Sequence, residues 1–228
     1  MDAEWIRVNL GPFSRFLTLA DFRFFNISLE GILESSSPEQ KAEFILQSIS
    51  NETVVTLVFK TLTNSSSLEN LASFFHSFVI GAAKRNLTSL STDVRHILLN
   101  MTLTALEPKF YLLMTEGFQL WFQNYLPLFL PSADSRTFEV IPRNITCSSY
   151  QEIVKGFDNI IGQLSEEQNQ LVLNFTLDYL EGQKSSGLSC VESGNVTDDR
   201  SWLLLNFGQF RFNASIKDFL TVNINFKA

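Results

Sequence analysis

The chain has 228 residues, 45% of them hydrophobic, which is enough to form one domain or one domain and part of another. Its formal net charge of −7 argues against nucleic acid and anionic membrane surfaces as partners, because both select basic patches. With two Cys and two His, the composition excludes zinc fingers, iron–sulfur clusters and a disulfide-rich miniprotein, and we expect no metal and no cofactor.

The beginning of the chain is repeated near its end, without a gap and with an offset of 197 residues. The shared pattern is Trp-x3-Asn-x-Gly-x-Phe, formed by Trp5, Asn9, Gly11 and Phe13 and again by Trp202, Asn206, Gly208 and Phe210. We therefore expect residues 1–201 to be one complete helical repeat unit and residues 202–228 to be the truncated start of a second copy.

The role expected of this repeated pattern is structural, and a ligand site built on Trp and Asn is the alternative. Gly11 and Gly208 are placed to end a short helix in a left-handed conformation. A hydroxyl N-cap with an Asp three residues later then starts the next helix, at Thr18 and Asp21 and at Ser215 and Asp218.

Capping signals and apolar periodicity predict helices along the rest of the chain. Capping boxes are expected at Ser37–Gln40, Ser149–Glu152 and Ser165–Gln168. The expected helices cover about 39–49, 52–62, 68–82, 92–106, 109–126, 150–164, 166–182 and 201–207. Residues 137–141 alternate like a strand but are too isolated to form a sheet, so the expected fold class is all-α.

Nine N-x-[ST] acceptor sequences occur, where about three are expected by chance from the Asn, Ser and Thr contents. This excess predicts a heavily N-glycosylated chain of the secretory pathway, although Asn-rich helix caps could also generate some acceptors. The acceptors are Asn26, Asn51, Asn64, Asn86, Asn100, Asn144, Asn174, Asn195 and Asn213.

The two cysteines, Cys147 and Cys190, are 43 residues apart. In an oxidising compartment a disulfide is the first expectation, and two buried free thiols are the alternative. The chain begins without a signal peptide and has no run of 18 uncharged apolar residues. We therefore expect an interior fragment of a longer, secreted or cell-surface precursor.

No catalytic signature such as G-x-S-x-G, H-E-x-x-H, a P-loop or C-x-x-C occurs, so no enzymatic activity is expected. His76 and His96 are interpreted as ordinary histidines. The 22 Phe residues are interpreted as core, and a Phe-lined cavity for lipid is the alternative.

The chain resembles the mesothelin, stereocilin and otoancorin group, and in particular repeat-containing mesothelin-like surface proteins of fishes. The residues that carry this resemblance are Ser36–Gln40, Ile141–Tyr150 and the Trp202-x3-Asn206-x-Gly208-x-Phe210 pattern, together with the dense acceptors. The resemblance implies an armadillo-like superhelical array, or a helical bundle, on the extracellular side of the cell.

The resulting functional expectation is a non-enzymatic extracellular module for cell adhesion or structural interaction. Its partner would be an extracellular or cell-surface protein, and any membrane attachment would use an anchor outside this segment. The alternative is a secreted carrier of a lipid or another hydrophobic ligand.

Overall fold

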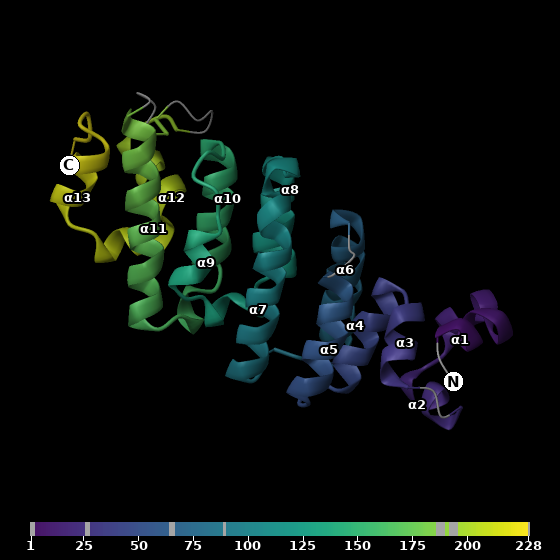
Figure 1. Cartoon of the computed structure of the whole chain (residues 1–228). Coiled ribbons are helices and arrows are strands. Elements are labelled where there is room, and N and C mark those ends of the chain that lie inside the picture. The colour runs from purple at the N-terminus through teal and green to yellow at the C-terminus, as the bar shows by residue number, and fades with distance from the viewer. Residues whose placement is uncertain are drawn as a thin grey trace. The chain divides into compact units, whose positions relative to one another are not determined.

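The structure is a computed structural model and describes residues 3–25, 28–63, 67–88, 90–185, 190–191 and 196–227. It confirms the all-α class, because these ranges contain helices and turns but no strand (Figure 1). The chain forms two compact units, Met1–Ala105 and Leu106–Ala228. The predicted repeat boundary at Trp202 lies inside the second unit, because the motif that begins there packs on helices of that unit.

The first compact unit consists of helices of 6 to 17 residues. Within it α1 packs on α3, and α4 packs on both α5 and α6. Its elements are α1 (Ala3–Asn9), the 3-10 helix η1 (Gly11–Phe16), α2 (Leu19–Phe24), α3 (Leu29–Ser35), α4 (Pro38–Gln47), α5 (Glu52–Thr63), α6 (Leu68–Lys84) and α7 (Thr92–Leu106).

The start of α4 confirms the capping box predicted for this part of the chain. The Ser37 side chain accepts from the Gln40 main-chain N–H, and the Gln40 side chain accepts from the Ser37 N–H. Pro38 occupies the first turn, where a missing N–H costs nothing. The Gln40 amide also donates to the Ser14 carbonyl at 2.7 Å, so the same cap fixes α4 to η1.

Phenylalanine rings form the core between α5 and α6. The ring centres of Phe59 and Phe74 are 5.4 Å apart, and those of Phe74 and Phe75 are 5.1 Å apart, both pairs edge to face. All three side chains and Phe78 are fully buried. Each buried ring stabilises the fold by about 1.5–3 kcal/mol, so these Phe residues act as core, as the sequence predicts.

In the second compact unit α10 packs on α8, η3 and α12, and α11 packs on α9, η6 and α13. The elements are η2 (Glu107–Leu112), α8 (Thr115–Gln119), the π-helical η3 (Leu120–Tyr125), η4 (Leu130–Ser132), α9 (Ser135–Glu139), α10 (Cys147–Asp158), η5 (Ile161–Gln163), α11 (Glu166–Ser185), α12 (Asp199–Phe207), η6 (Gly208–Asn213) and α13 (Ile216–Val222). All of these elements except α11 and α10 are shorter than ten residues.

Three predictions are wrong in this unit. Residues 109–126 do not form one helix, because a 3-10 helix that starts around Pro108 ends before α8. Residues 137–141 are not a strand, because Asp134 caps α9 and Thr137 completes its capping box. The helix and capping box expected at Ser149 are also wrong, because Thr146 is the N-cap of α10 and α10 ends at Asp158 instead of continuing to residue 164.

Gly156 sets how closely α10 approaches the π-helical segment η3. A Cβ atom at this position would lie 2.7 Å from the main-chain oxygen of Phe122. Any larger residue would push the two helices apart, so the absence of a side chain at Gly156 is a packing requirement.

Candidate functional site

The described glycan acceptors lie at the surface. Asn26, Asn64 and Asn195 lie outside the described residues. In contrast to the acceptors, Asn206 and Asn223 are buried, and neither belongs to an N-x-[ST] sequence. The exposed acceptors are Asn51, Asn86, Asn144, Asn174 and Asn213, and Asn100 is half-buried.

Several acceptors also stabilise the helix to which they belong, either by capping its end or by a side-chain hydrogen bond along it. The Asn51 Oδ1 accepts from the Val54 N–H at 3.1 Å and caps α5. Asn86 has a φ of +52° and ends α6 in the left-handed position that Asn tolerates next best after Gly. The Asn174 Oδ1 accepts from the Gln170 amide at 2.9 Å. At Asn51 and Asn174 the side-chain oxygen accepts these hydrogen bonds. A glycan is attached to the side-chain nitrogen, which is a different atom.

Asn100 differs from the other acceptors because its amide nitrogen is the atom engaged. This nitrogen lies 2.8 Å from His96 Nε2 within α7. The hydroxyl residue of this acceptor sequence, Thr102, is fully buried and donates to a main-chain carbonyl of its own helix. Thr176, in the Asn174 acceptor sequence, is buried in the same way.

The two cysteines form the predicted disulfide. The sulfur atoms of Cys147 and Cys190 are 2.04 Å apart, and the two Cα atoms are 5.5 Å apart. Cys190 is buried and has a φ of +52°. The bond ties the first residue of α10 to the chain that follows α11, and it closes a loop of 43 residues.

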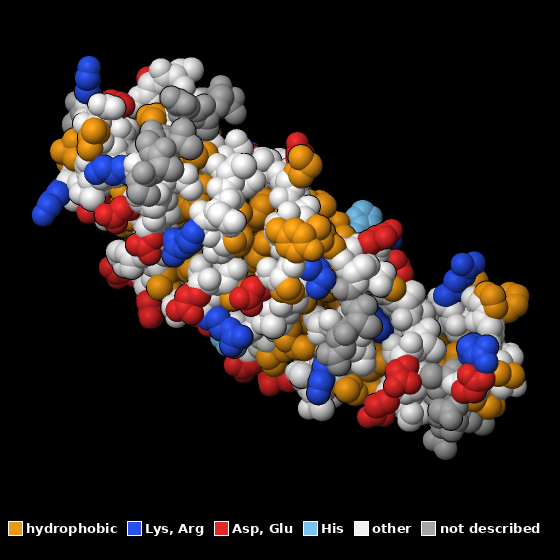
Figure 2. All heavy atoms as spheres, turned by 45° about the horizontal axis from the view of Figure 1, so that its top comes forward, with side chains coloured by type: hydrophobic (Ala, Val, Ile, Leu, Met, Phe, Trp, Pro, Cys, Tyr) orange, Lys and Arg blue, Asp and Glu red, His pale blue; other side chains and the backbone are white. Residues whose placement is uncertain are grey.

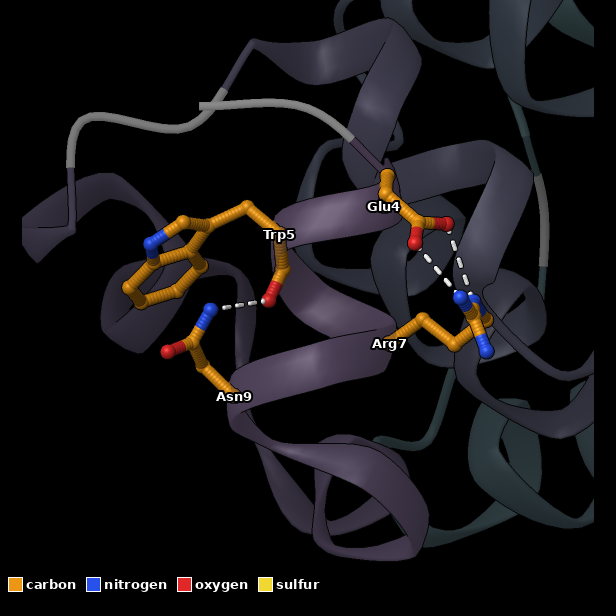
Figure 3. A network of polar contacts seen from close by, with 4 residues as sticks. All are labelled: Glu4, Trp5, Arg7 and Asn9. Carbon is orange, nitrogen blue, oxygen red and sulfur yellow. Dashed lines mark hydrogen bonds and ion pairs between the residues drawn. The ribbon is translucent and has the colours of Figure 1, made fainter.

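The repeated pattern has the same local structure in both copies. We call α1–η1–α2 (residues 3–24) the N-terminal motif and α12–η6–α13 (residues 199–222) the C-terminal motif. In both, the Asn side chain donates to the Trp carbonyl four residues earlier at 2.9 Å, at Asn9 and Trp5 (Figure 3) and at Asn206 and Trp202. The similarity of sequence is therefore a similarity of structure.

The glycines of both motifs have a positive φ, +49° at Gly11 and +52° at Gly208, as predicted. The expected left-handed helical conformation is wrong for Gly208, because its ψ is −134°. This backbone region is close to exclusive to glycine, and it turns the chain directly into η6.

The capping boxes predicted for α2 and α13 are present. Thr18 and Ser215 accept from the main-chain N–H of Asp21 and Asp218, and each carboxylate accepts from the cap residue in return. Hydrogen bonds from the Thr18 hydroxyl and N–H hold the pKa of Asp21 below its usual value. Hydrogen bonds from Ser215, first from its N–H, lower the pKa of Asp218 in the same way.

A polar connection inside the second unit holds the C-terminal motif on α10. The Tyr150 hydroxyl donates to the Asn206 carbonyl at 2.6 Å, and the Gln151 amide donates to the Asn206 Oδ1 at 3.2 Å. The Tyr150 ring stacks on Tyr179 with ring centres 4.0 Å apart. Burial raises the pKa of Tyr150 well above its usual value and raises that of Tyr179 to about 12.

A surface groove of about 540 Å³ lies between the region of η2 and α8 and the chain that precedes α10. Phe110 and Phe118 form part of its wall, and the Met114 side chain beside them is 77% exposed. The acceptor Asn144 also lines the groove, so a glycan there would stand at its rim. Figure 2 shows further hydrophobic side chains at the surface, among charged ones.

His76 and His96 are both exposed, and within the described ranges no group of His, Cys, Asp or Glu is arranged to hold a metal ion. Among the described helices, none is long and apolar enough to span a membrane. No family model, no curated protein and no solved structure matches the chain.

Proposed function

We propose that the chain is a non-enzymatic, extracellular glycoprotein segment built of tandem helical repeats, and that it acts as a module for cell-surface adhesion or structural interaction. The observation that carries the proposal is the exposure of the acceptors. Each described acceptor is exposed or half-buried, as the attachment of a glycan requires. The Cys147–Cys190 disulfide supports an oxidising compartment.

The first test is glycan occupancy. The full chain, fused to a secretion signal, is produced in animal cells, and its mass is measured before and after enzymatic removal of N-glycans. We expect glycans at the exposed acceptors, among them Asn51, Asn144 and Asn213. A secreted chain that carries no glycan would contradict the extracellular part of the proposal.

The second test is binding. The glycosylated chain, multimerised and fluorescently labelled, is applied to intact cells and to cells whose surface proteins have been removed with trypsin. We expect binding to intact cells that trypsin treatment abolishes. A non-glycosylated chain is the control for glycan-dependent binding, and the absence of binding across several cell types would disprove adhesion through a surface protein.

The groove beside α8 supports a second candidate, the carriage of a hydrophobic ligand. It has an apolar wall that includes Phe110, Phe118 and Leu113. Native mass spectrometry of the secreted chain tests this candidate. Co-purified lipid that is lost in a Met114→Asp variant would support the candidate, and a ligand-free chain would exclude it.

A further inference from the structure

The N-terminal and C-terminal motifs differ in how much of the equivalent face is covered by other helices. Trp202, Asn206 and Phe210 of the C-terminal motif are all fully buried. Their equivalents at the offset of 197 are half-buried at Trp5, exposed at Asn9, and 73% exposed at Phe13. One face of the same structural element is therefore core in one copy and surface in the other.

In the C-terminal motif the cover is the helix pair α10 and α11. Both helices pack against α12 and η6, and α11 packs against α13 as well. Tyr150 and Gln151 of α10 donate to the two oxygens of Asn206. The Asp158 carboxylate at the end of α10 accepts from the Gln209 N–H at 2.8 Å, and Lys184 of α11 donates to the Thr221 carbonyl at 2.7 Å.

Other exposed aromatics of the N-terminal motif show that the difference is specific to this face. Phe16 is 68% exposed and Phe24 is 86% exposed. Their equivalents, Asn213 and Thr221, are exposed even in the covered C-terminal motif. Cover by a helix pair of the same kind would therefore bury Phe13 but leave Phe16 and Phe24 accessible.

We propose that the face formed by Trp5, Asn9 and Phe13 is the docking surface for the α10–α11 helix pair of a neighbouring repeat unit. This inference rests on the tandem-repeat part of the proposed function and is independent of adhesion. The N-terminal motif has the two residues that this contact uses in the C-terminal motif. Asn9 is the equivalent of Asn206, and Gly11 has a positive φ as Gly208 does; a Cβ at Gly11 would meet no atom within 4 Å. Such glycines permit close approach of another backbone or side chain, as Gly208 permits that of Asp158.

One of the hydrogen bonds cannot be repeated. The equivalent of Gln209 is Pro12, which has no N–H to donate to the Asp158 carboxylate of a neighbouring unit. The docked N-terminal motif would therefore keep the aromatic burial and the Asn contacts but lose this bond. We expect it to bind the helix pair somewhat less tightly than the C-terminal motif does.

A graft within the full chain tests the inference. Residues 202–222 are replaced by residues 5–25, so that the N-terminal motif is offered to α10 and α11 at the position of the C-terminal motif. We expect the graft to fold. Phe13→Asp in the grafted copy should lower Tm by at least about 5 °C, while Phe16→Asp should shift it by less than about 2 °C. In the original chain, where the N-terminal copy is uncovered, Phe13→Asp should also shift Tm by less than about 2 °C.

A graft that fails to fold while the original chain folds would overturn the inference, and so would equal effects of the two Asp substitutions in the graft. A tandem chain, in which residue 201 is followed directly by residues 5–228, gives a second measurement. Hydroxyl-radical labelling of Trp5 and Phe13 in its second unit should fall several-fold relative to the single chain, while labelling of Phe16 and Phe24 should not. A failure of cell binding would leave these results unaffected, so the two proposals fail separately.

Discussion

The Tyr150 hydroxyl lies 2.6 Å from the main-chain oxygen of Asn206, 56 residues further along the chain. Both residues are fully buried, so neither group can exchange this partner for water. This bond joins α10 to the helix that carries the C-terminal copy of the repeated pattern. The attachment of that copy to the second compact unit thus includes a specific polar contact as well as apolar burial.

Removal of this hydroxyl should destabilise the second unit. Tyr150→Phe leaves the Asn206 carbonyl buried without its donor, and we expect a loss of about 1–3 kcal/mol in the free energy of unfolding. Urea denaturation followed by the fluorescence of the buried Trp121 and Trp202 measures it. Tyr111→Phe is the control, since this side chain is 82% exposed, and an equal loss in both variants would contradict the prediction.

Stability should fall at high pH because of the buried tyrosines. The pKa of Tyr179 is raised to about 12 from its ordinary value of 10.0. Below pH 10 the hydroxyl is protonated in both states, and its full contribution is present. Above pH 10 the unfolded chain loses this proton while the folded chain keeps it, so the free energy of unfolding declines through the interval up to about pH 12.

Urea denaturation at a series of pH values tests this behaviour. Tyr179→Phe should show a shallower decline between pH 10 and 12 than the unchanged chain does. Parallel curves for the two proteins would show that Tyr179 does not contribute.

The disulfide should stabilise the second unit by limiting its unfolded state. A closed loop of 43 residues corresponds to about 4 kcal/mol in the chain-entropy treatment. We expect the Cys147→Ser, Cys190→Ser double variant to unfold at lower urea concentration than the oxidised chain. Reductant should lower the midpoint of the unchanged chain and leave that of the variant where it is; sensitivity of the variant to reductant would contradict this assignment.

Gly156 offers a matched comparison with Gly162. Gly156→Ala places a methyl group against the Phe122 main-chain oxygen and should cost about 1–3 kcal/mol, the range for overpacking. Gly162→Ala meets no atom within 4 Å and should leave stability within about 0.5 kcal/mol. Thermal unfolding of the two variants decides the point, and equal midpoints would show that α10 can move away from η3 without cost.

The helices that local sequence controls could be predicted well. The predicted range 92–106 coincides with α7, because a single apolar face runs through it without Pro or Gly. The change from the α-helical α8 to the π-helical η3 could not be predicted, because no residue type marks it in the sequence and both segments pack on α10, which is distant in the chain.

The features of the candidate site likewise include some that the sequence predicts and some that it does not. The acceptors, the cysteine pair and the repeated pattern are visible in the sequence, since each depends on residue type and spacing. The pairing of Tyr150 with Asn206 is not, because Tyr150 falls on an apolar stripe and its partner is far away in the chain. The unequal cover of Phe13 and Phe210 could not be inferred either, since the two sequences are alike and only their surroundings differ.

The contacts that each acceptor sequence makes within its helix decide which substitution removes the acceptor without disturbing that helix. At Asn51 the exposed Thr53 can be changed to Ala, which abolishes the acceptor and keeps the cap of α5. At Asn144 the same strategy fails, because its hydroxyl residue, Thr146, is the N-cap of α10. At Asn174 the hydroxyl residue Thr176 is buried, so the asparagine itself has to be replaced. If the hydroxyl residue were replaced at every acceptor sequence, the substitution at Thr146 would also remove the N-cap of α10. Its effect could then not be assigned to the acceptor alone.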